Sequence, residues 1–208
     1  MPIGLQEMHP AVVHFPIAFL PLSLGADALG RLTGDYALQE MGRRTMPLAA
    51  AAAVNAAAFG LIAQQAVRAE GQAHDLLVTH RTLNAGLVGL TTALAVKRLR
   101  SRRPGLGYLA LGFAAYGMMA YSAYLGGRMA YAHGVGIKPA GGVNEPRGPE
   151  IGLGEVREGA RIAAGNLAEG AVGAAREYAA GKVAPALVSA DKAFDHPMDD
   201  GQPAAPRW

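Results

Sequence analysis

The chain has 208 residues, of which 51% are hydrophobic and only 17% charged, and its 19 basic and 16 acidic side chains leave a net charge of +3. This weak charge excludes the electrostatic footprint of a nucleic-acid-binding protein, whereas the apolar, glycine-rich composition is typical of closely packed membrane helices. Cysteine is absent, which excludes disulfides, iron–sulfur clusters and c-type haem attachment within the chain.

Four apolar segments follow one another along the chain, near residues 11–32, 46–67, 76–96 and 106–125. Each is close to the roughly 20 residues that an α-helix needs to cross the hydrocarbon core of a bilayer. Small residues recur in each segment and suit close approach of helices in lipid. The sequence therefore predicts an all-α fold, with an integral membrane four-helix bundle over residues 1–137.

Basic residues are concentrated around the first and third connections between these segments. They are Arg31, Arg43, Arg44, Lys97, Arg98, Arg100, Arg102 and Arg103, whereas the second connection carries only Arg68. Cytoplasmic loops of membrane proteins carry the excess of Lys and Arg. We therefore expect a protein of the bacterial inner membrane, with the lipid bilayer as its surroundings and both termini periplasmic.

Asp27 and two prolines interrupt the apolar character of the first segment. Asp27 precedes Arg31 by four residues, a spacing that predicts an ion pair on one helix near the cytoplasmic surface. Pro16 and Pro21 lack a backbone N–H and are predicted to kink or locally unwind this helix. A kink at this point would open room for a ligand near the periplasmic end.

Residues 138–208 differ in composition, with seven prolines and no segment long enough to span a membrane. Small and apolar residues recur at helical spacing and predict a helix near residues 151–182. They are Val156, Ala160, Ala163, Leu167, Ala171, Ala174 and Tyr178. Such a stripe, mostly alanine, buries too little apolar surface for a hydrophobic core but is suited to packing against a partner. We therefore expect this external, partly helical tail to dock other membrane or periplasmic subunits. A partly ordered, solvent-exposed tail is the alternative.

Five of the six histidines lie at the ends of the apolar segments, all on the predicted periplasmic side. They are His9, His14, His74, His80 and His133. Histidine is the commonest side chain for binding haem iron or a transition metal and is unusual near a bilayer. His196 lies in the tail and is not a candidate ligand.

The spacing of these histidines predicts two levels. His14 follows His9 by five residues and His80 follows His74 by six, so the second of each pair lies about 7–9 Å deeper along its helix. His14 and His80 are therefore predicted to face each other as the axial ligands of a haem b iron. His9 and His74 are further candidate metal ligands near the water boundary.

Other residues at this level suit a haem site. Asn84 lies four residues after His80 and is predicted to orient its second ring nitrogen. Arg81 and Arg128 are candidate partners of the haem propionates. His133 lies in a glycine-containing turn that is predicted to fold back over the cluster.

Two alternatives to haem remain open. A copper or zinc site shared among three helices is one, although the histidine spacings are not those of two ligands on one helix face and no cysteine assists. Neutral histidines bonded to backbone carbonyls or to Asn84 are the other.

Two blocks of sequence resemble the signatures of a known family. Residues 9–18 (HPAVVHFPIA) resemble the opening signature of the domain-of-unknown-function 2231 family of bacterial membrane proteins, and residues 125–136 (LGGRMAYAHGVG) resemble its closing signature. His80 with Asn84 is similar to the middle signature. The resemblance covers roughly residues 8–137 and implies a four-helix membrane protein with repeated histidines, without an assigned activity.

From these patterns we expect a haem b-binding, cytochrome b-like subunit that transfers electrons at the periplasmic face. A non-catalytic structural or assembly subunit of a larger membrane complex is the main alternative. Both interpretations describe an electron-transfer or accessory subunit rather than a stand-alone enzyme.

Overall fold

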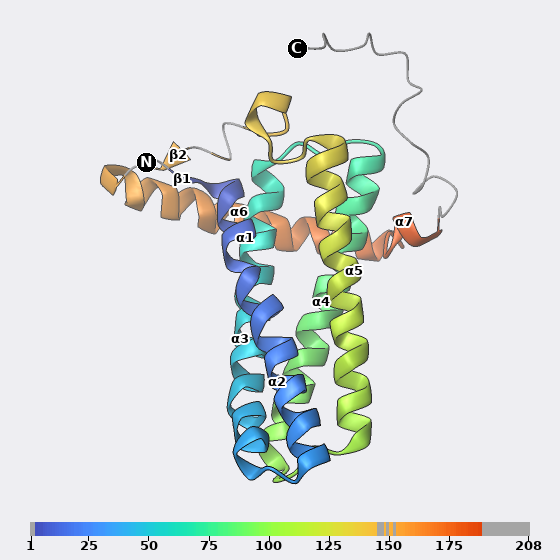
Figure 1. Cartoon of the computed structure of the whole chain (residues 1–208). Helices are drawn as coiled ribbons and strands as arrows, with labels where there is room; N and C mark the ends of the chain where they lie inside the picture. The colour runs from blue at the N-terminus through green and yellow to red at the C-terminus, as the bar shows by residue number, and fades with distance from the viewer. Residues whose placement is uncertain (1–2, 145–147, 149, 152, 189–208) are drawn as a thin grey trace, which may run out of the picture.

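The computed structural model describes residues 3–144, 148, 150–151 and 153–188. Helices make up most of it, as predicted, and four long ones lie side by side in an up-and-down bundle (Figure 1). In chain order the four long helices are α2 (His14–Thr33), α3 (Tyr36–Ala66), α4 (Gln72–Arg100) and α5 (Leu106–His133), and the short α1 (Leu5–Val12) leads into α2. The all-α class is therefore confirmed, and the helices extend beyond the apolar segments because polar residues continue them.

The two ends of the bundle differ in their connections. Residues 34–35 and 101–105 lie at one end, here called the basic end, and residues 67–71 lie at the other (Figure 1). The turn at the basic end is short because Gly34 has φ 75°, which ends α2, and the Asp35 carboxylate accepts the first free N–H groups of α3. The basic connections therefore share one end, as the sequence predicts.

The first helix is interrupted where the sequence predicts a kink. α1 stops at Val12 and α2 begins at His14, with Val13 between them. Pro16 has no N–H to offer the Val12 carbonyl, so the regular ladder cannot run through this point. Pro21, by contrast, is accommodated inside α2. Val13 itself keeps helical backbone angles, and its N–H and carbonyl bond to the His9 carbonyl and the Ile17 N–H, so only one hydrogen bond of the ladder is lost.

Side chains from all four long helices fill the middle of the bundle. The central cluster consists of Leu20, Leu24, Met46, Ala49, Ala50, Leu87, Leu94, Ala95, Tyr108, Leu109, Ala115 and Met119. Of the described helical stretches, Leu5–Thr33 and Tyr36–Ala66 are long and apolar enough to cross a membrane by length and composition. α4 and α5 are nearly as long, but charged side chains in α4 lower its apolar character.

The tail contains a helix that lies across the bundle rather than along it. α6 (Val156–Ala179) crosses α3 near the end opposite the basic end, here called the tail end (Figure 1). Shorter elements join it to the bundle. They are β1 (Ile3–Gly4), which pairs antiparallel with β2 (Glu150–Ile151), and also η1 (Lys138–Ala140), η2 (Leu153–Glu155) and α7 (Pro185–Val188).

The buried face of α6 coincides only in part with the predicted stripe. Of the stripe, Ala174 is buried and Ala163 and Tyr178 are partly buried, whereas Val156, Ala160, Leu167 and Ala171 are exposed; the other buried positions are Gly159, Asn166 and Gly170. A Cβ atom on Gly170 would lie 2.6 Å from the Leu61 carbonyl oxygen of α3. Backbone therefore packs against backbone, which only glycine permits, and this contact sets the face that α6 presents to the bundle.

Candidate functional site

Two histidines meet inside the tail end of the bundle. The rings of His9, on α1, and His80, on α4, have centroids 6.1 Å apart and planes at 87° to each other. Both side chains are partly buried. Two segments that are 71 residues apart in the chain thus bring their imidazoles together at one level.

Backbone carbonyls bind one nitrogen of each ring. His9 Nδ1 lies 3.0 Å from the Ala56 carbonyl oxygen of α3, and His80 Nδ1 lies 2.8 Å from the Ser122 carbonyl oxygen of α5. A carbonyl only accepts, so Nδ1 carries the proton in both rings. A neutral ring then keeps its lone pair on Nε2, which is the tautomer that a metal ligand requires.

Asn84 supports the His80 ring through Ser122. The Asn84 side-chain amide donates to Ser122 Oγ at 2.9 Å and to the His80 carbonyl at 2.8 Å. Ser122 Oγ in turn lies 3.0 Å from His80 Nδ1. The expected orienting effect of Asn84 is therefore indirect, because the hydroxyl and carbonyl of Ser122 lie between it and the ring.

The predicted partner of His80 was the wrong histidine. His14 is exposed at the start of α2, and the ring beside His80 is that of His9. The prediction assumed that the helix starts near residue 11 and leaves His9 at its rim. α1 instead begins at Leu5, so His9 lies within a helix and packs against α3.

The tail helix binds two of the other predicted residues. Arg81 Nη2 lies 2.5 Å from Glu177 Oε2, and His74 Nε2 lies 2.9 Å from Glu177 Oε1. The Arg81 guanidinium also lies over the ring of Tyr178, 5.2 Å from its centroid. In this structure Arg81 and His74 thus form a clamp that holds α6 to α4, a role that the sequence does not predict for either.

Arg128 and His133 lie at the tail end of α5. Arg128 is partly buried, and His133 is the last residue of the helix, before Gly134 with φ 66°. Within the described residues, the buried Nε2 of His133 has no hydrogen-bond partner, and no group of three or more His, Asp or Glu side chains is placed to bind one metal ion. His196 lies outside the described residues.

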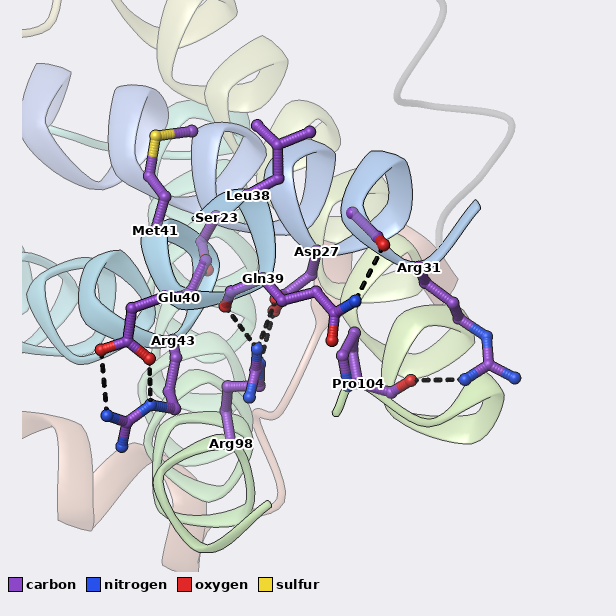
Figure 2. Close-up of polar contacts among 12 residues, drawn as sticks. Ser23, Asp27, Arg31, Leu38, Gln39, Glu40, Met41, Arg43, Arg98 and Pro104 are labelled. Atoms are coloured by element: carbon purple, nitrogen blue, oxygen red, sulfur yellow. Dashed lines mark hydrogen bonds and ion pairs between the residues drawn. The ribbon is translucent and has the colours of Figure 1, made fainter. Parts of the chain in front are cut away.

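A buried ion pair at the basic end is the main polar feature that the sequence does not predict. Arg98, on α4, donates from Nε and Nη2 to the two carboxylate oxygens of Asp27, on α2, each at 2.8 Å (Figure 2). The two side chains are 1% and 0% exposed. Tyr108 donates to the same carboxylate at 3.0 Å, and the Gln39 and Ser101 carbonyls accept from the guanidinium. The pair is therefore well satisfied.

The predicted ion pair between Asp27 and Arg31 is wrong. Arg31 instead donates to the Pro104 carbonyl at 2.8 Å, as Figure 2 shows. Gly42 of α3 packs against Asp27 so closely that a Cβ there would lie 2.4 Å from the carboxylate. An acidic residue inside an apolar segment indicates a buried cation partner, but in the sequence Arg98 stands among the arginines of the following loop.

The clamp at Glu177 predicts an acid-dependent release of α6. Burial raises the pKa of Glu177, but the hydrogen bonds and charges of Arg81 and His74 outweigh it, so the pKa is lowered. A lowered folded-state pKa contributes stability that is complete above the ordinary value of about 4.3 and is lost as the pH falls through the folded value. We expect α6 to stay docked at neutral pH and to become sensitive to pepsin only as the pH falls through the lowered pKa of Glu177.

Glu177→Gln provides the control for this release. The variant should show looser docking of α6 already at pH 7 and a much smaller acid step. Glu158→Gln, which removes an exposed pair with Arg161 on the same helix, should keep the acid step of the unmodified chain. An acid step that is equal in Glu177→Gln would contradict the clamp.

Comparison with known proteins gives a family but no characterised relative. No curated protein and no solved structure matches the chain. One family model, described as "Predicted membrane protein (DUF2231)", matches residues 6–139. This range contains both histidines of the pair, the buried ion pair and all four long helices. The chain therefore belongs to the DUF2231 family of predicted membrane proteins.

Proposed function

We propose that the chain is a haem b-binding membrane subunit that transfers electrons at the tail end of the bundle, with His9 and His80 as the axial ligands. The observation that carries this proposal is the histidine pair, in which both Nδ1 atoms are bound to carbonyls and both Nε2 atoms keep their lone pairs. The bound iron would supply the redox chemistry. The chain would hold and orient the imidazoles and keep water away.

The two imidazoles meet at one point of the bundle. Their rings are in edge-to-face contact, with centroids 6.1 Å apart and planes at 87° to each other. Glycines flank both rings, because Cβ atoms on Gly60 and Gly126 would lie 3.2 and 3.5 Å from the Cε1 atoms of His9 and His80.

The number of available ligands favours haem over a bare copper or zinc ion. Zinc sites in proteins take three or four protein ligands. Within the described residues, only two imidazoles meet at this point and no larger group is placed to bind a metal. A bis-imidazole haem needs no more than two, since the porphyrin supplies the other four nitrogens. Arg81 is paired with Glu177.

The exterior of the bundle supports a location of all four long helices in a bilayer. Large apolar side chains are exposed on every one of them, including α4 and α5. Examples are Phe15, Leu29, Leu48, Val54, Val96, Leu99, Leu111 and Phe113, each at least 43% exposed. Charged Asp27 and Arg98 are buried instead. Such an arrangement suits lipid, and the positive-inside rule then places the basic end in the cytoplasm and both termini in the periplasm of a bacterial inner membrane.

An assembly role is a second proposal and concerns the opposite face of α6. The buried face of this helix is occupied by the bundle of the same chain, so a partner subunit would meet its exposed face. That face carries Val172, which is 50% exposed, while Val156 and Leu167, 57% and 37% exposed, lie at the edge of the buried face. Deleting residues 140–208 would then remove co-purifying subunits and leave the haem in place.

An optical spectrum of the detergent-purified protein tests the haem proposal directly. After growth with sufficient haem, we expect a Soret band that shifts on reduction and a pyridine haemochrome of the b type. Low-spin spectra in both oxidation states would agree with two imidazole ligands. Purified protein with no Soret band and no haemochrome would overturn the proposal.

A further inference from the structure

α6 lies across the bundle near its tail end, so in a bilayer this helix runs along the membrane surface (Figure 1). Gly170 packs against the Leu61 carbonyl of α3, and this contact fixes the level of the crossing. Leu61 follows Arg44, an exposed arginine of the basic end, by 17 residues, which is about 26 Å along the helix. The hydrocarbon core of a bilayer is roughly 30 Å thick. α6 therefore crosses the bundle close to the outer boundary of that core.

Two tyrosines of α5 lie at the same level. His80 Nδ1 lies 2.8 Å from the Ser122 carbonyl oxygen, so residues 121–124 of α5 lie beside the turn of α4 that holds Arg81. The Arg81 guanidinium in turn contacts α6. Tyr121 and Tyr124 are 40% and 50% exposed, and their rings stack on each other. Exposed tyrosines gather where the apolar core of a membrane meets water, so they mark the boundary at which α6 lies.

The two flanks of α6, on either side of its buried face, differ in polarity. Successive residues of an α-helix are about 100° apart around its axis. One side, here called the apolar flank, carries Val156, Ala160, Ala164, Leu167, Ala171 and Tyr178. The other side, here called the charged flank, carries Glu158, Glu169 and Arg176. All residues of the apolar flank except Tyr178 are exposed, so the described part of the chain leaves most of this flank uncovered.

Contacts with the bundle show which way each flank faces. Tyr178 Oη of the apolar flank lies 3.3 Å from Thr82 Oγ1, which is closer to the basic end than the clamp at Glu177. Arg176 of the charged flank lies beside Gln65 and the connection at the tail end. The apolar flank therefore faces the interior of the bilayer, and the charged flank faces away from it.

We propose that α6 is an interfacial helix whose apolar flank lies on the acyl chains of the outer leaflet, while its charged flank faces headgroups and water. Amphipathic helices in this position bury their apolar side about 5–10 Å into the boundary between headgroups and acyl chains. The flank continues the lipid-facing surface of the bundle, because Val54, 50% exposed, lies two turns closer to the basic end than Leu61 on the same face of α3. The proposal rests on the bilayer location proposed above and is independent of haem.

Spin labels on single cysteines test the proposal, because the chain has no cysteine of its own. Ala160→Cys and Ala171→Cys place a nitroxide on the apolar flank, where both alanines are exposed. Gly165→Cys and Arg176→Cys are the matched controls on the opposite side of the same helix, and a Cβ on Gly165 would meet no atom within 4 Å. The full-length variants are reconstituted in phosphatidylcholine vesicles with a water-soluble nickel chelate on both sides of the membrane. Power-saturation EPR compares the collisions of each nitroxide with oxygen, which concentrates in lipid, and with the chelate.

We expect the ratio of oxygen to chelate collisions to be several times higher in Ala160→Cys and Ala171→Cys than in the two controls. Val54→Cys is the reference, since a bundle that spans the bilayer gives this position the ratio typical of lipid. Equal, water-like ratios on both flanks, with a lipid-like ratio in Val54→Cys, would overturn the interfacial helix and leave the bilayer location intact. A water-like ratio in Val54→Cys would overturn that location and the proposal with it. Apolar-flank labels that meet neither reagent would assign the flank to a protein partner and overturn the proposal too.

Discussion

Replacing either His9 or His80 by alanine is expected to abolish the low-spin haem spectrum of the purified protein. Each imidazole would supply one of the two axial ligands, and a single remaining ligand leaves the iron five-coordinate and weakly held. The Soret absorbance per mole of protein and the pyridine haemochrome measure the loss. Thermal unfolding of each variant, followed by circular dichroism, shows whether the helical bundle itself survives.

His14→Ala is the matched control for this experiment. His14 has the same side chain and lies only five residues from His9, but it is exposed at the start of α2. It should keep full haem occupancy. Asn84→Leu should keep both ligands but weaken haem binding about 10–100-fold. The substitution removes the hydrogen bond from Asn84 to Ser122 Oγ, and with it the group that orients the His80 ring. Loss of haem in His14→Ala together with retention in His9→Ala would contradict the geometry.

Arg98→Met is expected to lower the free energy of unfolding by about 3–5 kcal/mol, the largest stability effect in the chain. The substitution leaves the carboxylate of Asp27 buried without a cation, with only Tyr108 donating to it. A lone buried charge costs far more than a lost hydrogen bond. Thermal or denaturant unfolding in a fixed detergent, followed by circular dichroism, measures the change.

The double variant Asp27→Leu with Arg98→Met separates a buried charge from a lost contact. The double variant should lose less unfolding free energy than the two single variants lose in sum. The reason is that each single variant leaves one buried charge without its partner, whereas the double variant leaves no buried charge. Arg43→Met is the control, since it removes an ion pair with Glu40 at the surface of the same end. That variant should change stability little. Additive single variants would show that the pair is not coupled.

The helices could be predicted from the sequence because each combines length with low charge. The sequence also predicts that histidines meet at one level of the bundle, but it does not predict which two histidines pair. Depth along a helix depends on where the helix begins, and α1 begins at Leu5, before the apolar segment. His14 follows His9 by five residues and so lies about 140° further around the helix, which is why two histidines of one motif differ in burial. Hydropathy does not register either event.

Contacts made by small or charged residues are the other features that the sequence does not predict. The contact face of α6 includes Gly159 and Gly170, which carry no hydrophobic signal, so the periodic stripe of small residues predicts only part of the buried face, Ala174 among it. The partner of Asp27 lies 71 residues away, and Arg98 was indistinguishable in sequence from the loop arginines that follow it. The identity of long-range polar partners depends on packing, which no local pattern encodes.

The ion pair of Asp27 and Arg98 also constrains the order in which the chain assembles. Asp27 is synthesised 71 residues before its partner, so the first helical hairpin is complete while this carboxylate still has no counter-ion. A lone carboxylate disfavours an apolar interior. We therefore expect the packing of α2 against α3 at the basic end to be completed only when α4 contributes Arg98, so that the four helices mature as one unit rather than as two independent hairpins.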